Sequence, residues 1–570
     1  MIDFSKRHIG INSEEKKEML DCLKVKSIEQ LISETIPSNI RLKKDMELDP
    51  ALNEYDYLNH IKNLSKKNKI FKSYIGLGYN EAIIPSVIKR NILENPSWYT
   101  AYTPYQAEIA QGRMQALLNY QTIVCELTGM ELANASLLDE STAAAEAMTM
   151  LFSLRNREQK KNNVNNFFVS NDTLSQTISL IKTRAQPLGI NVNIGKIDDF
   201  KFDKGYFGCL MQYPGIHGQV TDLAKYCEKA KLNGLKIVVA ADLLSLCLLK
   251  EPSCFGVDVV VGTSQRFGIP LGYGGPHAAF FATKEKYKRA IPGRIIGLSK
   301  DADENPALRM ALQTREQHIK RARATSNICT SQVLLAVMAS MYGVFHGPNG
   351  LKNIALKIHE LAVLLENSLE KIGIKQLNQN YFDTLYLKGP SEKIRPIAEK
   401  NKINFNYINE NHFSISLNET TSIADIQLII DVISKAISKE THITESSTEI
   451  LKISLPLRRE SSFLQTNIFN IHHTETSLMR YIKNLERKDL SLTHSMISLG
   501  SCTMKLNAAS EMIPISWSKW NNIHPYAPIN QAKGYQKLLT KLEEQLNVIT
   551  GFAGTSLQPN SGAQGEYAGL

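Results

Sequence analysis

Short apolar runs alternate with amphipathic stretches from about residue 73 to residue 330. The runs at 166–170 (NFFVS), 209–213 (CLMQY) and 236–242 (KIVVAAD) predict buried strands, because each is short, apolar and rich in strand-forming residues. Strands that alternate with amphipathic helices are typical of a parallel sheet with helices on its faces. We therefore predict an α/β fold.

The regions outside this alternation show other patterns. Residues 1–72 predict a helical extension, and Ser27 and Gln30 have the spacing of a capping box. The apolar run at 333–345 (VLLAVMASMYGVF) is too short to span a bilayer and predicts a buried helix. We expect a large domain at 73–340, a small α/β domain at 341–440 with a strand at 382–387, a linker with a terminal helix at 441–490, and the start of another large domain at 491–570.

An internal repeat connects the two large domains. The segment 73–78 (SYIGLG) matches 495–500 (SMISLG), an offset of 422 residues. The pairs that match at this offset include Trp98 and Trp520, Ala110 and Ala532, Gly112 and Gly534, and Gly129 and Gly551. After a two-residue deletion the offset becomes 420, and the pairs are Ser141 and Ser561, and Glu146 and Glu566. This register indicates a tandem duplication of one α/β unit, with the second copy truncated at Leu570.

A glycine-rich turn in the second copy is the first candidate for chemistry. At 558–566 (QPNSGAQGE) the pattern predicts a turn that opens a helix. Free N–H groups at a helix start bind anions, and glycine lets the backbone approach closely. Ser561, Gly562, Ala563 and Gln564 are thus predicted to hold a phosphate, and an ordinary loop-to-helix turn is the alternative.

The first copy differs at the same place. There the sequence at 139–146 is DESTAAAE, in which Thr142 and Ala145 fill the two glycine positions and two acids come first. Two carboxylates repel a phosphate. We expect this copy to keep the fold and to lack the anion site.

Several longer motifs resemble those of the P-protein (glycine decarboxylase) family of the glycine cleavage system. They are 7–10 (RHIG), 73–78, 98–106 (WYTAYTPYQ), 265–281 (QRFGIPLGYGGPHAAFF), 328–332 (ICTSQ), 499–507 (LGSCTMKLN) and 558–566. The resemblance covers essentially the whole chain. It implies a fold-type I pyridoxal 5'-phosphate (PLP)-dependent transferase-like fold in two similar halves, of which the front half is cofactor-free and the back half catalytic.

The resemblance also implies an activity: decarboxylation of glycine with PLP and transfer of the aminomethyl group to the lipoyl arm of the H-protein, by a homodimer of the full-length chain. The family's PLP lysine is expected near position 685, beyond Leu570, so no catalytic residue is expected within the chain. In the front half Gln265 occupies the equivalent position, and an amide cannot form an imine. Asp242, at a strand end, corresponds to a partner of the PLP ring nitrogen or simply caps a helix.

Two groups of residues are candidates for the glycine site. Ser501, Cys502, Thr503 and Lys505 are expected in a loop at the pocket mouth, although Lys505 could equally be a solvated surface amine. Tyr102, Thr103, Tyr105 and Gln106 are expected to reach across from the front half, and interface packing is the alternative for the tyrosines. His217 is expected to make a structural hydrogen bond.

Composition changes this picture little. The net charge of +10 is spread without a dense basic block, which indicates a compositional bias or a surface for an acidic partner and gives no motif for nucleic acid. The eight cysteines have no CxxC spacing, and neither a signal nor a transit peptide is visible, so we expect reduced thiols, no metal site, no membrane segment and a cytoplasmic location. The rival hypothesis is a non-catalytic scaffold subunit that completes a separate lysine-bearing chain. Another fold-type I enzyme is a remoter one, because a single-unit chain would lack the repeat.

Overall fold

The computed structural model describes residues 4–8, 10–101, 103–315, 317–321, 324, 331–439, 442–443, 451–495 and 507–570. The chain forms two compact units. The larger consists of Ile70–Lys505 with Asn521–Ala527, and the smaller of Met1–Lys69, Leu506–Trp520 and Pro528–Leu570.

The larger unit is built on a seven-stranded sheet of order β2-β8-β7-β6-β5-β3-β4. Strands β4, β3, β5, β6 and β7 are parallel, whereas β8 is antiparallel to β7 and to β2. The strand bounds are Leu132–Ala133 (β2), Asn166–Ser170 (β3), Asn191–Gly195 (β4), Tyr206–Tyr213 (β5), Lys236–Ala241 (β6), Val259–Thr263 (β7) and Ala279–Thr283 (β8). The predicted strands at 166–170, 209–213 and 236–242 are β3, β5 and β6, apart from Asp242, which follows β6.

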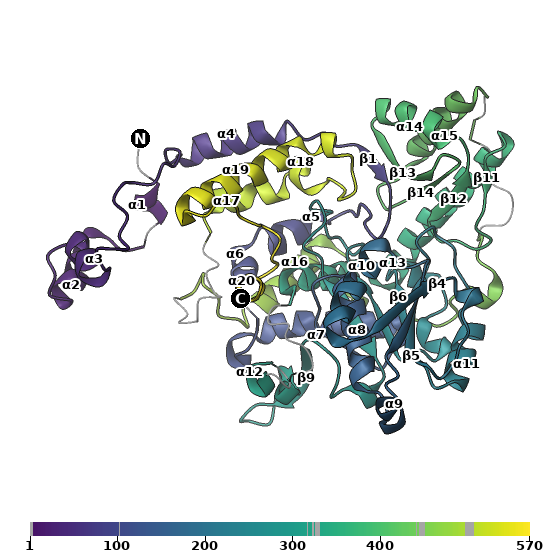
Figure 1. Ribbon diagram of the computed structural model, residues 1–570, viewed down its shortest axis with the longest axis horizontal. Helices are drawn as coiled ribbons and strands as arrows, with labels where there is room; N and C mark the ends of the chain where they lie inside the picture. The colour runs from purple at the N-terminus through teal and green to yellow at the C-terminus, as the bar shows by residue number, and fades with distance from the viewer. Residues whose placement is uncertain are drawn as a thin grey trace. The chain divides into compact units, whose positions relative to one another are not determined.

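Helices cover both faces of this sheet (Figure 1). Val238 and Ala240 of β6 pack into one apolar cluster with α8 (Glu140–Ser153) and α10 (Ser175–Ala185). Ile237 and Val239 point to the other face, where α7 (Gln111–Thr128), α11 (Ala224–Leu232) and α13 (Val333–Lys371) pack. This alternation of successive strand residues puts a core on each side of the sheet.

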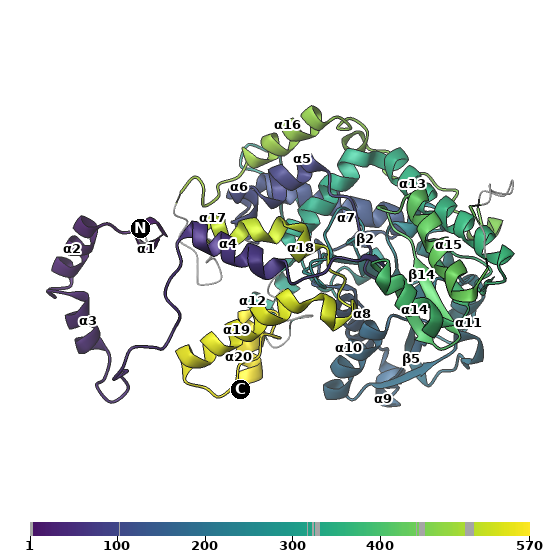
Figure 2. The ribbon, with the colours of Figure 1, turned by 90° about the horizontal axis from the view of Figure 1, so that it is seen from above.

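A five-stranded sheet of order β1-β13-β14-β12-β11 is the second main sheet of the larger unit. Figure 2 shows α14 (Ser391–Lys400) and α15 (Ile423–Ile437) alongside β14. The strand bounds are Lys72–Tyr74 (β1), Lys375–Gln376 (β11), Thr384–Lys388 (β12), Ile403–Asn409 (β13) and His412–Ser416 (β14). The strand expected at 382–387 is β12. The first residues of the repeat at 73–78 lie in this smaller sheet, because β1 pairs with β13.

Shorter elements complete the larger unit. They are α5 (Ser86–Ile88), α6 (Pro96–Tyr99), α9 (Arg157–Lys161), α12 (Gln317–Lys320), α16 (Glu475–Glu486) and the antiparallel pair β9 (Ile295–Lys300) and β10 (Pro306–Ala311). The apolar run at 333–345 is buried in α13, as predicted, and this helix bends at Gly347, whose φ is 61°. No helix among the described residues is long and apolar enough to cross a bilayer.

The smaller unit is helical. Its elements are α1 (Ser5–His8), α2 (Ser13–Cys22), α3 (Ile28–Thr35), α4 (Glu54–Ser65), α17 (Ala509–Met512), α18 (Ser518–Asn521), α19 (Lys533–Thr550) and α20 (Gly562–Gly569). Ser27 caps α3 by accepting the N–H of Gln30, as predicted, and the Gln30 side chain accepts the N–H of Lys26 rather than that of Ser27. The bond from Ser27 is therefore the predicted one, whereas the Gln30 side chain binds the N–H one residue earlier than a capping box requires.

The helix bounds follow the register of the repeat. α7 and α19 each have 18 residues and begin 422 residues apart. Each ends at a left-handed glycine, Gly129 with φ 71° and Gly551 with φ 72°. A glycine is favoured there because other residues are strained at positive φ. These matched bounds are those that a duplicated unit would have.

Candidate functional site

The start of α8 in the first copy is occupied by the chain's own carboxylates. The Asp139 carboxylate accepts the N–H of Thr142 at 2.7 Å. Glu140 is buried, and its Oε1 accepts hydrogen bonds from Thr177 and Gln212, each at 3.4 Å. The start of α8 is thus occupied by hydrogen bonds of the chain's own carboxylates, and the lack of an anion site there stays a prediction.

The helix begins earlier in the first copy than the sequence alignment predicts. Asp139 caps α8 and Ser561 caps α20, so the two caps lie 422 residues apart and not 420. The physical reason is that Asp139 is itself a strong cap. Ser141, the sequence match of Ser561, is therefore helical, and its Oγ hydrogen-bonds Thr177 at 3.2 Å. By cap geometry, Glu140 is the counterpart of Gly562.

Burial raises the pKa of Glu140 to about 7, although hydrogen bonds from Gln212 and Thr177 oppose the rise. Because this folded pKa exceeds the ordinary value of 4.5, Glu140 destabilises the fold progressively as the pH rises from about 4.5 to about 7. We expect Glu140→Gln to gain up to about 3 kcal/mol of unfolding free energy over the parent at pH 8, and nothing near pH 4. Urea titrations across this range measure the difference. The exposed control Glu410→Gln should follow the parent, and parallel curves for Glu140→Gln would contradict the prediction.

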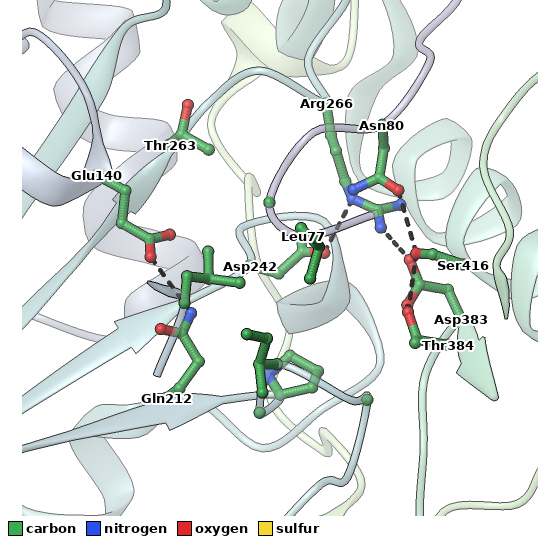
Figure 3. A pocket seen from close by; sticks show the side chains of 16 residues that line it. Leu77, Asn80, Glu140, Gln212, Asp242, Thr263, Arg266, Asp383, Thr384 and Ser416 are labelled. Carbon is green, nitrogen blue, oxygen red and sulfur yellow. Dashed lines mark hydrogen bonds and ion pairs between the residues drawn. The ribbon is translucent and has the colours of Figure 1, made fainter. Parts of the chain in front are cut away.

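A small polar cavity of about 70 Å³ adjoins this helix start. Figure 3 shows Glu140 and Gln212 on one side of it and Arg266 with Asp383 on the other. Pockets that enclose a ligand of PLP's size usually measure about 300 Å³ or more. The cavity therefore has room for a few water molecules and not for the cofactor.

The Arg266 guanidinium forms ion pairs with two carboxylates that line this cavity. Arg266 Nε lies 2.9 Å from Asp242 Oδ2, and Arg266 Nη2 pairs with Asp383. The Arg266 and Asp383 side chains are almost fully buried. Burial raises the pKa of Asp242, and Arg266 opposes the rise. Asp242 also accepts the N–H of Leu244 at 2.9 Å, a bond within the turn that follows β6.

Gln265 makes a structural network at the position expected for a lysine. Its Nε2 donates to the carbonyls of Asn80 and Ile269, both at 2.7 Å, and its Oε1 accepts the N–H of Asn80 at 3.0 Å. The side chain is fully buried. All of its contacts are to backbone, which is the role of a residue that holds a loop.

The turn in the second copy is open. Ser561 Oγ accepts the N–H of Gln564 at 3.2 Å, and Gln564 Oε1 accepts the N–H of Asn560 at 2.7 Å. A Cβ added to Gly562 would have no atom within 4 Å. Within its unit, the start of α20 thus lacks the acidic side chains that fill the start of α8.

The glycine-site candidates of the front half lie just before α7. Thr103 is buried, and Gln106 is exposed and directly precedes a short 3-10 turn, Ala107–Ile109. Arg294 Nη2 donates to the Tyr105 hydroxyl at 2.5 Å and lies over its ring, a contact within the front half. Tyr102, Ser501, Cys502, Thr503 and Lys505 lie outside the described residues.

His217 differs from its prediction. Its buried Nδ1 has no hydrogen-bond partner among the described residues, and its ring stacks on Tyr386 with the centroids 4.9 Å apart. Burial lowers the pKa of His217. The ring is therefore held by stacking, and the expected structural hydrogen bond of Nδ1 is not made within this part of the chain.

The ion pair between Arg266 and Asp383 was not predicted from the sequence. The only signal for Arg266 was its place beside Gln265 in a long family-like motif, and Asp383 lies 117 residues further on. A sequence pattern does not show that two such distant residues pair.

Comparisons with known proteins define the class and then the family. The solved structure of a glycine decarboxylase (P-protein) in inhibitor-bound form is 30% identical with a TM-score of 0.68, and the match covers 75% of this chain and 99% of that one. A Burkholderia pseudomallei sphingosine-1-phosphate lyase has a TM-score of 0.50 at 11% identity, covering 70% of this chain and 93% of that one, and shares the fold alone. The fold is thus that of fold-type I PLP-dependent enzymes.

The family follows from the sequence matches. A family model described as glycine cleavage system P-protein matches residues 6–433. Glycine dehydrogenases (decarboxylating) from Flavobacterium johnsoniae and a Nostoc species are 61% and 53% identical over this whole chain. The chain belongs to the glycine cleavage system P-protein family. It spans 60% and 58% of the length of these two relatives.

Proposed function

We propose that this chain supplies the front half and the phosphate-binding turn of a PLP-dependent glycine decarboxylase that passes the aminomethyl group to the lipoyl arm of the H-protein. The observation that carries the proposal is the contrast between the two helix starts. The buried carboxylate of Glu140 stands at the first position of α8, whereas Gly562 stands at the same position of α20. A duplicated protein with one cofactor site needs this difference.

The residues at the start of α20 fit a phosphate group. Ser561 caps the helix by accepting the N–H of Gln564, and Gly562 and Ala563 bring backbone N–H groups to the helix N-terminus, where the helix dipole also favours an anion. When bound, PLP supplies an electron sink for the carbanion that remains after carbon dioxide leaves glycine. The work of this chain is to hold the phosphate and so to orient the ring.

A matching segment supports a role for the front-half residues at the glycine site. Asn521–Ala527, the counterpart of residues 99–105, packs within the larger unit. His524 Nε2 donates to the carbonyls of Gly76 and Tyr79 at 3.0 and 3.2 Å, and Tyr526 donates to Gln176 at 3.1 Å. If the duplication is reciprocal, Tyr102, Thr103, Tyr105 and Gln106 reach the equivalent rim of the second copy. We propose that they contact glycine there, together with Ser501, Cys502, Thr503 and Lys505.

The first test asks whether these 570 residues hold PLP on a lysine. We propose that they do not and that they do not decarboxylate glycine alone, because Gln265 fills the matched position of the first copy. The purified chain mixed with PLP should show no absorption from lysine-bound PLP. A band that disappears when a single lysine is replaced would contradict this.

The second test joins the chain in frame to the remaining part of the Flavobacterium relative. The fusion should bind PLP, form homodimers and release carbon dioxide from glycine when lipoylated H-protein is present. Gly562→Glu, which copies Glu140 of the first copy, should weaken PLP binding by about a hundredfold or more, since a carboxylate would face the phosphate. Glu140→Gly in the same fusion is the matched control and should leave PLP affinity unchanged. Equal affinities of the parent and Gly562→Glu would refute the proposed phosphate turn.

The alternative function is a scaffold subunit that completes a separate lysine-bearing chain. The open turn at Gly562 disfavours it, because a scaffold has no use for a phosphate site. Activity on mixing this chain with a complete second-copy chain that carries its own turn would favour the scaffold, provided that Gly562→Glu then has no effect.

A further inference from the structure

The repeat extends to two helices that precede the copies. α4 and α16 each have 12 residues and begin 421 residues apart. Both contain the sequence IKNL, at 61–64 and at 482–485. Their N-caps, Asn53 and Thr474, each accept the N–H of the residue three positions further on. We call α4 and α16 the leading helices.

Each leading helix packs on the other copy. α4 precedes the first copy and packs against α19 of the second within the smaller unit (Figure 1). α16 precedes the second copy and packs against α7 of the first within the larger unit. The backbone contacts correspond as well, because Lys69 N–H donates to Gln531 at 2.8 Å and Leu490 N–H donates to Ile109 at 3.1 Å.

A side chain just after each leading helix caps the helix on which it packs. The Asp489 carboxylate accepts the N–H groups of Gly112 at 2.7 Å and of Arg113 at 3.2 Å. Asn68 Oδ1 accepts the N–H groups of Gly534 at 2.7 Å and of Tyr535 at 3.2 Å. The two caps therefore accept matching pairs of N–H groups, Asp489 with its two oxygens and Asn68 with one.

The two capping residues differ in charge, and the residues that they cap differ in a complementary way. Asp489 Oδ2 also accepts from Arg113 Nε at 2.9 Å, and both side chains are more than nine-tenths buried. In the other cap Asn68 is neutral and Tyr535 stands in the place of Arg113. If α16 docked on α19, the Asp489 carboxylate would lie beside Tyr535 and would lose its ion pair with Arg113. If α4 docked on α7, Asn68 would lie beside Arg113 and would not supply the carboxylate that Asp489 supplies. Burying an ion without its partner is strongly unfavourable.

We propose that these matched pairs, Asp489 with Arg113 and Asn68 with Tyr535, determine which leading helix docks on which copy. Such a determinant is needed because both leading helices contain IKNL, so either could dock on either copy. In addition, α4 directly precedes the first copy along the chain, although it packs on the second. An apolar match alone would allow either docking, whereas the charge mismatch penalises the wrong one. The proposal does not depend on PLP or on glycine.

Disulfide trapping in the full chain tests the proposal. Two native pairs, Ile109→Cys with Leu490→Cys and Gln531→Cys with Lys69→Cys, adjoin the antiparallel bridges of Ala110 with Asp489 and of Ala532 with Asn68. Residues opposite each other across such a bridge are close enough for a disulfide. We expect both native pairs to cross-link in high yield in the parent. The mismatched pairs, Ile109→Cys with Lys69→Cys and Gln531→Cys with Leu490→Cys, should not.

Exchange of the caps is the decisive variant. Asn68→Asp combined with Asp489→Asn should lower both native yields by about tenfold or more, since each helix then meets a mismatched partner. Adding Arg113→Tyr and Tyr535→Arg matches the pairs again and should restore the native yields. Loss of this recovery, or cap-exchanged yields equal to those of the parent, would overturn the proposal.

A variant confined to the larger unit distinguishes a local loss of docking from general misfolding. Asp489→Asn alone should lower the yield of the 109–490 cross-link and leave that of the 69–531 cross-link unchanged. Arg113→Tyr added to it should recover the lost yield, because the pair then resembles Asn68 with Tyr535. A cross-link that falls equally in the single and double variants would show a merely structural role for Asp489 and would also overturn the proposal.

Discussion

Replacing Arg266 by Met is expected to lower the free energy of unfolding of the larger unit by about 3–5 kcal/mol. The guanidinium is the cation between Asp242 and Asp383, and its side chain is 8% exposed. Methionine keeps much of the volume but leaves two carboxylates in a cavity of about 70 Å³. Unpaired buried charges cost more than the pair itself contributes, so the loss comes mainly from the carboxylates left behind.

The measurement can be confined to the larger unit. Of the three tryptophans, Trp98 lies there, whereas Trp517 and Trp520 lie in the smaller unit. Urea titration followed by the fluorescence of Trp98, in a background with the other two replaced by Phe, therefore reports this unit.

Two further variants separate charge from packing at Arg266. Arg395→Met removes an exposed arginine paired with Glu399 and should change stability by less than about 0.5 kcal/mol. Asp242→Asn and Asp383→Asn, added to Arg266→Met, should recover most of the loss. If the triple variant is no more stable than Arg266→Met, unpaired charge is not the cause.

Replacing Gly112 by Ala is expected to cost about 2–4 kcal/mol. The added Cβ would lie 1.9 Å from the carbonyl oxygen of Leu485 and 2.5 Å from its carbon. These are backbone atoms of α16, so no side-chain rotation relieves the clash and the helix must move away. Its movement would also break the bonds from Asp489 to Gly112 and Arg113.

The Trp98 titration measures this loss as well. Thr122→Ala, in the same helix and half-buried, is the control and should stay within about 0.5 kcal/mol of the parent. Gly534→Ala in α19 should disturb its own unit less, because there the nearest backbone atom, the oxygen of Leu64, is 2.8 Å from the added Cβ. A Gly112→Ala chain as stable as the Thr122→Ala control would show that α16 does not pack tightly on α7.

Much of the first copy could be predicted from the sequence because its signals are local. The strand at 166–170 has the predicted bounds, and the apolar run at 333–345 is a buried helix. The two acids at the start of α8, Asp139 and Glu140, were visible in the sequence as well. Periodicity and helix caps depend on neighbouring residues, so the sequence contains them directly.

The sequence by itself also determined the family, the repeated motifs and the contrast between the acids at 139–140 and the glycine-rich turn at 558–566. Only the tertiary structure showed that Arg266 joins Asp242 to Asp383, that α4 packs on α19 and that α16 packs on α7. The reason is physical. The pairing of Arg266 with Asp383 and the docking of these helices join residues more than a hundred positions apart, and their energy comes from burial, which exists only after the chain has folded.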